Sequence, residues 1–436
     1  MPGGALGGSR THRGSGVMLQ FVCMLLGAVV LTGTALAADP AEQKSMPEAD
    51  THRGGQPPPT LQEVLAAALH RSPYQQVLEA QRTQAQALTA HGDRLLGDVP
   101  ALALLYRTDQ VGSDDGLREY DAAVELPLWR WGQRHAAQAV ATHATQLLAG
   151  SEEAWRLTVA GEVRESIWEV ALRQNNLVLA RQEWQATEAT ERDVAKRVGL
   201  GELAQTDLML ARTDTLTRKG AYLRAEAEVL HAQQRYATLT GLERLPRKRG
   251  EQVSERATIV AEHPLLAQAQ ARVAEARARL DAIRQKATGN PQLLLGGKHE
   301  RAAIGEDYND SLQLGLRLPF GTHAYSGADI AAVQRDYAEA AAERDQLVRE
   351  LGLALHEAEH NLETTQAALD IAVEQNQIAQ EHLRLAKIAF SVGEFDLVGF
   401  LRVQNIAFAA QRSEQELRIM RQLAVARYNQ AVGILP

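Results

Sequence analysis

The chain has 436 residues, of which 45% are hydrophobic but only 5% aromatic, and it carries a formal net charge of −8. A composition dominated by Ala, Leu, Gln, Glu and Arg favours long helices over thick globular cores. The negative charge, with no basic stripe of interleaved aromatic residues, argues against nucleic acid as a partner.

The N-terminal segment has the layout of a secretory signal. Arg10 and Arg13 precede an apolar run over residues 17–36, and the run closes on the small residue Ala37. A positive flank, an apolar centre and small residues at the cut predict a signal peptide over residues 1–37. An uncleaved anchor helix is the alternative, because the run is just long enough to span a bilayer.

Residues 38–59 are rich in Pro, Gly and charged residues and predict a flexible leader. Cleavage would also remove Cys23, the only cysteine, and would leave a mature chain without a thiol. No later segment approaches about 20 consecutive apolar residues, so any later membrane crossing has to use strands.

The most regular stretch runs from Val348 to Phe390, with apolar or small residues at alternating steps of three and four. Only Thr365 and Asn376 interrupt this heptad pattern, which predicts a long helix packed against another helix. The pattern stops near Gly393, and a second helical pattern then begins. A glycine just after a long helix is a usual stop signal, so a helical hairpin with its tip near residues 391–396 is expected.

The same unit occurs 192 residues earlier in the sequence. The heptad pattern recurs from Val163 to Val198, and its tip falls near residues 199–203. Other landmarks share this offset: Leu126-Pro127 with Leu318-Pro319, Arg235-Tyr236 with Arg427-Tyr428, and Gly241 with Gly433. A shared offset predicts an internal two-fold repeat. The predicted divisions are repeat 1 at 60–241, a linker at 242–260, and repeat 2 at 261–436.

Each repeat contains a helical start, two strands and a long hairpin. Shorter helices are expected at 61–96, broken at Ser72-Pro73, and at 265–287. Long helices are expected at 129–198 and 322–390, each on the order of 100 Å if unbroken, with Gly150-Ser151 as a candidate kink in the first. The return helices are expected at 203–239 and 397–432.

Two segments, 118–128 and 310–319, alternate apolar and polar residues as half-buried strands do. Their expected partners are 99–108 and 292–301, and the facing of the latter is ambiguous. Strands of about ten residues suit a tilted crossing of a bilayer, although hairpins on a soluble core are the alternative. The polar faces supply the candidate lumen residues: Glu119, Asp121, Glu125, Gln313 and Arg317.

Four strands cannot close a membrane sheet, because unpaired backbone groups in hydrocarbon cost several kcal/mol each. The smallest bacterial barrels have about eight strands, so copies of the chain have to complete the wall. Twelve strands from three copies would leave a water-filled lumen, which suits the polar face. The predicted fold is mainly α with a small β part: an α-barrel of long antiparallel helical hairpins and a transmembrane β-barrel completed by trimerisation.

In this arrangement the sequence resembles the outer membrane efflux family, the TolC-like outer membrane factors, over residues 60–435. The resemblance rests on the duplicated layout and on the two tips, Val198-Gly199-Leu200-Gly201-Glu202-Leu203 with Asp207, Ala211 and Arg212, and Val392-Gly393-Glu394-Phe395. Glu125-Leu126-Pro127-Leu128, followed by Gly132-Gln133-Arg134, resembles the heavy-metal cation-efflux subgroup in particular. Two features depart from the family pattern: Gly399 stands at the counterpart position of Asp207, and Asp98-Val99-Pro100 replaces an Asn-Pro.

The resemblance implies a homotrimer in the outer membrane that extends into the periplasm. It also implies a periplasmic adaptor (membrane fusion) protein, an inner-membrane transporter of the RND type, and outer-membrane lipid as partners. It implies no cofactor, no enzymatic activity and no resident metal. The expected function is an exit duct in tripartite efflux, with metal cations as candidate substrates. The adaptor would dock at the two tips, whose residues are Gly199, Leu200, Gly201, Glu202, Leu203, Asp207, Gly393, Glu394, Phe395 and Asp396.

Other functions remain as alternatives. Drug efflux and type I protein secretion use the same kind of duct. A periplasmic coiled-coil adaptor would have one hairpin flanked by compact β domains, whereas two hairpins are predicted here. A zinc peptidase is suggested by His356-Glu357-Ala358-Glu359-His360, which matches the HExxH motif, with Glu381 as a third ligand. The motif lies inside the heptad pattern, with no evident cleft. A catalytic zinc needs three protein ligands and an open coordination position in a dry pocket.

Overall fold

The computed structural model describes residues 57–286, 289–320 and 323–436, and the side chains of all of these except 323–325. Backbone contacts divide the chain into Met1–Gln56 and Pro57–Pro436, and all of the described residues belong to the second unit. The predicted signal peptide and almost all of the predicted leader lie outside the described residues. Within the described ranges, no helix is both long and apolar enough to cross a membrane.

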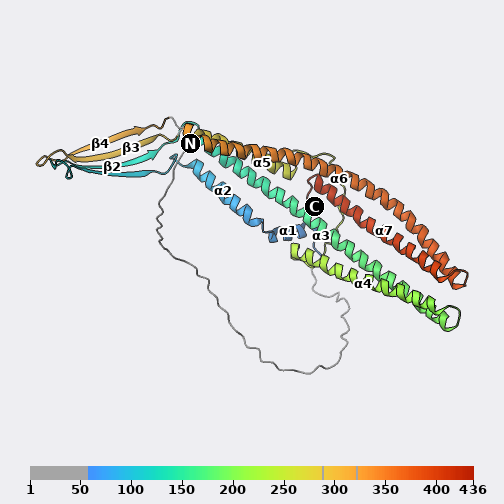
Figure 1. Cartoon of the computed structure of the whole chain (residues 1–436). Helices are drawn as coiled ribbons and strands as arrows, with labels where there is room; N and C mark the ends of the chain where they lie inside the picture. Colours follow the sequence, from blue (N-terminus) through green and yellow to red (C-terminus); the bar gives the residue numbers. More distant parts are fainter. Residues whose placement is uncertain (1–56, 287–288, 321–322) are drawn as a thin grey trace, which may run out of the picture. The chain divides into compact units, whose positions relative to one another are not determined.

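Eleven elements are formed by the described residues, in the predicted order (Figure 1). They are α1 (Leu61–Arg71), α2 (Gln75–Asp93), β1 (Ala101–Thr108), β2 (Arg118–Pro127), α3 (Gln133–Gly199), α4 (Gln205–Thr240), α5 (Pro264–Lys286), β3 (Gln292–Arg301), β4 (Asn309–Arg317), α6 (His323–Ser391) and α7 (Leu397–Ala431). The predicted fold class, mainly helical with a small antiparallel sheet, is confirmed. The first long helix, α3, begins later than predicted, at Gln133 rather than at residue 129.

The four strands form one antiparallel sheet in the order β1-β2-β3-β4. The two hairpins are joined through the β2–β3 pair, in which Tyr120 lies opposite His299. Within the described chain β1 and β4 each pair on one side only, so both outer edges of the sheet are open.

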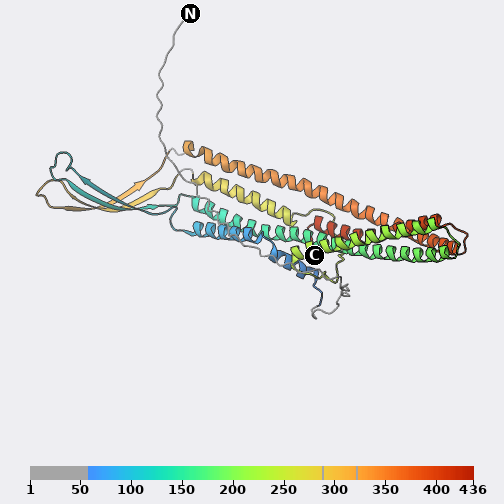
Figure 2. The same ribbon diagram turned by 60° about the horizontal axis from the view of Figure 1, so that its bottom comes forward.

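The helices pack in a single layer, and the sheet extends from one end of it (Figures 1 and 2). α2, α1 and α4 follow one another along one side of α3, while α5 and α7 follow one another along its other side. α6 packs on α5 and α7. The outermost helices of the layer are therefore α2, α1 and α4 at one border and α6 at the other.

The heptad pattern of α6 is buried as predicted, with Leu351, Leu355, Ala358, Leu369, Ala372, Ala379, Ala386 and Phe390 each at most 9% exposed. Val348 is an exception at 48% exposed. Val348 lies further from the hairpin tip than the end of α7, so α7 does not cover it.

The expected kink at Gly150-Ser151 is wrong, because α3 runs unbroken through both residues. A Cβ on Gly150 would lie only 3.1 Å from Cα of Gln268 on α5. The glycine thus permits close approach of two helices, and the buried hydroxyl of Ser151 accepts a hydrogen bond from the Gln268 amide at 3.2 Å.

A buried cluster lies where α1, α3 and α4 meet. Its members are Val64, Leu65, Ala68, Val159, Ala160, Val163, Ile167, Val170, Ala232 and Tyr236. The Tyr236 hydroxyl donates to the carbonyl of Arg244 at 3.0 Å, and its repeat counterpart Tyr428 donates to the carbonyl of Arg256 at 2.7 Å. Each tyrosine therefore fixes part of the segment that links the two halves.

Candidate functional site: sheet faces and hairpin tips

One face of the sheet is apolar across all four strands. The strand register places three rows side by side: Leu126, Leu293 and Leu316; Leu102, Val124, Leu295 and Leu314; Leu104, Ala122, Gly297 and Leu312. Leu312 and Leu314 are 91% and 73% exposed. The register also settles the ambiguous strand, because Leu293 and Leu295 belong to this face. Such an exposed apolar face marks contact with another apolar surface.

The opposite face is polar and contains all five predicted lumen residues, Glu119, Asp121, Glu125, Gln313 and Arg317. Its carboxylates are largely paired. Glu119 is 2.9 Å from Arg107 and 2.7 Å from Lys298, and Glu125 is 3.7 Å from Arg317. These cations offset most of the acidic charge on the face.

Aromatic residues lie at both ends of the apolar face. Tyr106 and Tyr120 pack at 4.9 Å between ring centroids in the row beyond Leu104. At the other end, Trp131 and Phe320 are 96% and 95% exposed. Tyr120 to Pro127 spans about 23 Å along a strand. This length of strand is close to the height of the apolar band in outer-membrane barrels, which is about 25 Å and is flanked by aromatic girdles.

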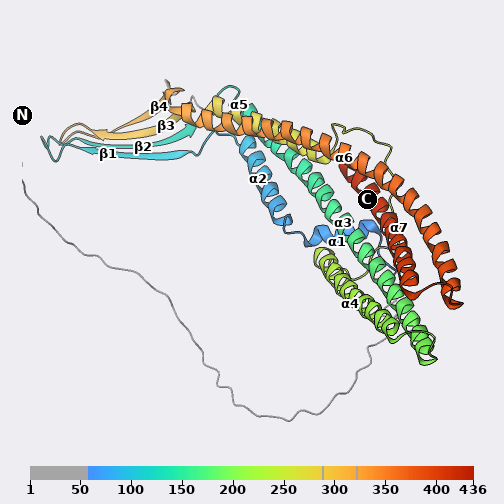
Figure 3. The same cartoon turned by 45° about the vertical axis from the view of Figure 1, so that its right-hand side comes forward.

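The far ends of the long helices form two turns (Figures 1 and 3). Gly201 and Gly393 have φ of +78° and +80°, a backbone conformation that favours glycine, and no described atom lies within 4 Å of a Cβ built on either. Leu200 and Val392 are 75% and 65% exposed. Open space and exposed apolar side chains are what a docking surface requires.

The predicted tip residues differ in their exposure. Gly199 is the last residue of α3, and Glu202 and Glu394 are exposed. Leu203 and Phe395 are partly buried and pack against a buried cluster.

Asp207 and Asp396 both cap helices. The Asp207 carboxylate accepts from the amide of Ala204, and the Asp396 carboxylate accepts from the amide of Gly399, each at 3.1 Å. This explains the departure noted in the sequence, because a Cβ on Gly399 would lie 2.6 Å from that Asp396 oxygen. An aspartate cap is thus present at both tips, at different positions.

The two tips are joined by a cluster that includes residues from both hairpins, here called the tip cluster. It consists of Val194, Ala211, Ala386, Phe390, Leu397, Phe400, Leu401 and Val403. Arg197 of α3 lies at its edge, donating to the carbonyl of Phe390 at 2.9 Å and to Glu202 at 3.1 Å. Its guanidinium also lies 5.0 Å from the Phe390 ring centroid. Arg197 therefore connects the first tip to the second.

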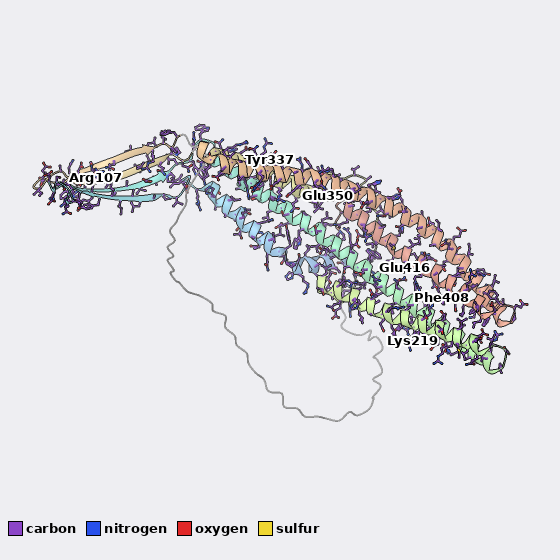
Figure 4. All side chains as sticks on the ribbon, viewed as in Figure 1. Arg107, Lys219, Tyr337, Glu350, Phe408 and Glu416 are labelled. Carbon is purple, nitrogen blue, oxygen red and sulfur yellow. The ribbon has the colours of Figure 1, made fainter. Side chains whose placement is uncertain are left out.

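A second connection lies further from the tips. Glu183 of α3 is buried and accepts from Arg218 of α4 at 2.9 Å and from Arg412 of α7 at 2.6 Å. Arg218 also contacts Asn405 and lies 5.4 Å from the ring centroid of Phe408, which Figure 4 labels on α7. One buried carboxylate thus holds arginines from both hairpins.

Asp214 lies beside this group, 3.8 Å from the Arg218 guanidinium. Burial raises the pKa of Asp214, and the Arg218 charge opposes that rise. One of its carboxylate oxygens is buried without a hydrogen-bond partner in the described chain.

A third polar group lies at the middle of the helical layer. Arg164 is buried, donates twice to Glu251 at 2.8 and 2.7 Å, and donates to Gln430 and to the carbonyl of Ile434. Arg164, Arg197 and Glu183 were not among the predicted site residues. Each stands directly beside an apolar position of the heptad pattern of α3, which is the signal that was available.

The HExxH residues do not assemble a metal site. His356, Glu357 and His360 are exposed on α6, and Glu381 instead pairs with Arg384 at 2.7 Å. Among the side chains that the structure describes, no group of three or more His, Cys, Asp or Glu could hold a metal ion.

Residues 257–433 match the model of the family described as outer membrane efflux protein. The predicted resemblance to this family is confirmed. The sequence has no match among proteins of curated function.

Solved structures with the same fold include CmeC, VceC and CusC. CmeC, the outer membrane channel of Campylobacter jejuni, matches with a TM-score of 0.69 at 14% identity, covering 90% of this chain and 94% of CmeC. VceC of Vibrio cholerae matches with a TM-score of 0.69 at 16% identity, covering 86% and 97%. CusC matches with a TM-score of 0.68 at 14% identity, covering 86% and 92%. The fold of these solved structures therefore extends over nearly the whole described chain.

Proposed function

We propose that this protein is the outer-membrane channel component of a tripartite efflux system. The observation that carries the proposal is the amphipathic four-stranded sheet, exposed on its apolar face and open at both edges. In hydrocarbon such edges have to be paired, because each unsatisfied backbone group costs several kcal/mol. The membership of residues 257–433 in the outer membrane efflux family supports the same function.

The channel is a homotrimer in this proposal. Three copies supply twelve strands, which enclose a water-filled lumen lined by the polar face, whereas eight strands would be filled by side chains. The apolar face with its aromatic rows then contacts outer-membrane lipid, and the helices extend into the periplasm.

The tips form the entrance and the docking surface for a periplasmic adaptor, below which an inner-membrane transporter of the RND type supplies the energy. Leu200, Glu202, Val392 and Glu394 are the exposed contacts, and Gly201 and Gly393 keep both turns tight. Opening separates the two hairpins of each chain and breaks the bonds that Arg197 and Arg412 make between them. The protein supplies a path and performs no chemistry on the substrate.

Metal cations are the first candidate substrate. The support is the sequence resemblance to the heavy-metal subgroup and the structural similarity to CusC. Drug efflux is the second candidate, since the lumen face is nearly balanced in charge.

Fractionation and a deletion strain test these proposals. The protein should be found in the outer membrane as a trimer that dissociates on heating, and a soluble, discrete monomer would refute the channel function. A strain lacking the gene should become sensitive to metal salts while its drug sensitivity stays unchanged. The reverse pattern would support drug efflux instead.

A further inference from the structure

A groove of about 590 Å³ runs along α3, between residues of α4 on one side and residues of α7 on the other. A volume of about 300–1,000 Å³ is typical of small-molecule sites. The groove is separate from the tips and from the sheet, because no residue that lines it belongs to either. Its apolar lining comes from all three helices and consists of Trp168, Leu172, Leu239, Ile419, Met420 and Leu423.

The groove opens on the side of α3 that faces away from α1. Val163 of α3 packs in the buried cluster that α3 shares with α1. Leu172 follows Val163 by nine residues, which at 3.6 residues per turn places it on the opposite side of the helix. Met420 at the groove is 46% exposed, so a ligand can reach the apolar lining from this side.

One ion pair stands on each wall of the groove. On the α4 side, Arg235 donates two hydrogen bonds to Glu169, at 3.2 and 2.5 Å. On the α7 side, Arg427 donates two hydrogen bonds to Glu165, at 2.6 and 2.8 Å. The two arginines stand 192 residues apart in the sequence, which is the offset of the repeat. Both guanidinium groups are therefore already matched by a carboxylate.

Two carboxylates in or next to the groove have no such cation. Glu162 of α3 lines the groove, is exposed, and forms no ion pair within the described chain. Glu416 of α7, which Figure 4 labels, precedes Met420 by four residues and so lies on the same side of its helix. The groove therefore carries uncompensated negative charge beside an apolar surface.

A hydroxyl group in the groove also lacks a partner. Ser166 lines the groove, and its side-chain oxygen is buried without a hydrogen-bond partner among the described residues. Buried polar groups are normally paired, so this oxygen is available to a donor on a bound molecule.

We propose that this groove binds an organic cation that has an apolar body. The apolar body packs on Trp168 and its neighbours, the positive group pairs with Glu162, and the Ser166 hydroxyl accepts a hydrogen bond from it. A bare metal ion fits less well, because such ions prefer several oxygen ligands and both Glu165 and Glu169 are already paired. The inference goes beyond the proposed channel, since binding within one chain requires no trimer, adaptor or transporter.

Fluorescence anisotropy of rhodamine 6G, a cation with an apolar ring system, tests the site on the purified full-length protein in detergent. The wild-type protein should bind the dye saturably. Glu162→Gln should weaken binding about fivefold, which is the modest effect of losing an exposed ion pair. The matched control Glu153→Gln should bind as the wild type does, because Glu153 is exposed and precedes Glu162 by nine residues, on the opposite side of α3.

The zwitterion formed by removing the ester group of rhodamine 6G separates charge from apolar contact, and it should bind more weakly than the cation. Equal affinity of the two dyes, equal affinity of Glu162→Gln and wild type, or binding that never saturates would overturn the inference. Light scattering on the same sample reports assembly independently. A trimer that does not bind the dye overturns this inference alone, and a monomer that binds it overturns only the proposed assembly.

Discussion

The bond between Arg412 and Glu183 is expected to hold the entrance closed. Replacing Arg412 with methionine keeps the aliphatic stem of the side chain and removes its 2.6 Å hydrogen bond across the hairpins. The other bond to Glu183, from Arg218, lies within the first hairpin and is retained. The variant therefore isolates one contact between the hairpins.

The magnitude follows from the burial of the two partners. A hydrogen bond to a charged group contributes about 1.5–3 kcal/mol when buried. Glu183 is buried, but the Arg412 side chain is 43% exposed, so solvent screening lowers the expected value to about 1 kcal/mol. If three copies open together, the closed state loses about 3 kcal/mol, or roughly a hundredfold in the opening equilibrium.

Single-channel recording in planar lipid bilayers measures this shift. Arg412→Met should raise the open probability strongly, while Arg192→Gln, which removes an exposed pair with Glu188 on α3, should not. In a double-mutant cycle, Glu183→Gln should abolish the effect of Arg412→Met. An Arg412→Met channel as closed as the wild type would refute the assignment of this bond to the gate.

Three further predictions concern the tip, the central polar group and the pH dependence of stability. Gly393→Trp should abolish export in cells while leaving the trimer intact on a gel. The new side chain enters open space, and a non-glycine residue at this positive φ costs only about 1–2 kcal/mol of stability. The control Gly352→Trp, on an open stretch of α6, should retain export. Arg164→Met should lower the free energy of unfolding by about 3–5 kcal/mol in denaturant, because it leaves Glu251 without its buried cation. The control Arg156→Ala, which removes an exposed pair, should change it by less than about 0.5 kcal/mol. Equal effects would contradict the role of burial. His263 is fully buried, and burial lowers its pKa. The unfolded chain therefore binds the proton first, and stability present above about pH 6.5 should fall as the pH drops below it. A His263→Gln variant should show a shallower fall in melting temperature over the same pH range.

The order of the elements could be predicted because periodicity is a local property. Helical hairpins, strands and tips followed from heptads, alternation and glycine, as Gly201 and Gly393 illustrate. The face of β3 was ambiguous in isolation, because Leu293, Leu294 and Leu295 are consecutive and offer no alternation. Pairing with β2 decided it, since Val124 fixes Leu295 on the apolar face.

The sequence by itself determined the long helices, the amphipathic strands and the need for further copies, because each follows from residue spacing along one element. Only the tertiary structure showed that Arg197, Glu183 and Arg164 join separate helices, since residues as far apart in sequence as Arg164 and Ile434 meet only after packing. It also showed which apolar residues stay uncovered. A heptad residue faces a partner or solvent according to where its helix lies in the layer, and the order of the helices is a property of the whole fold.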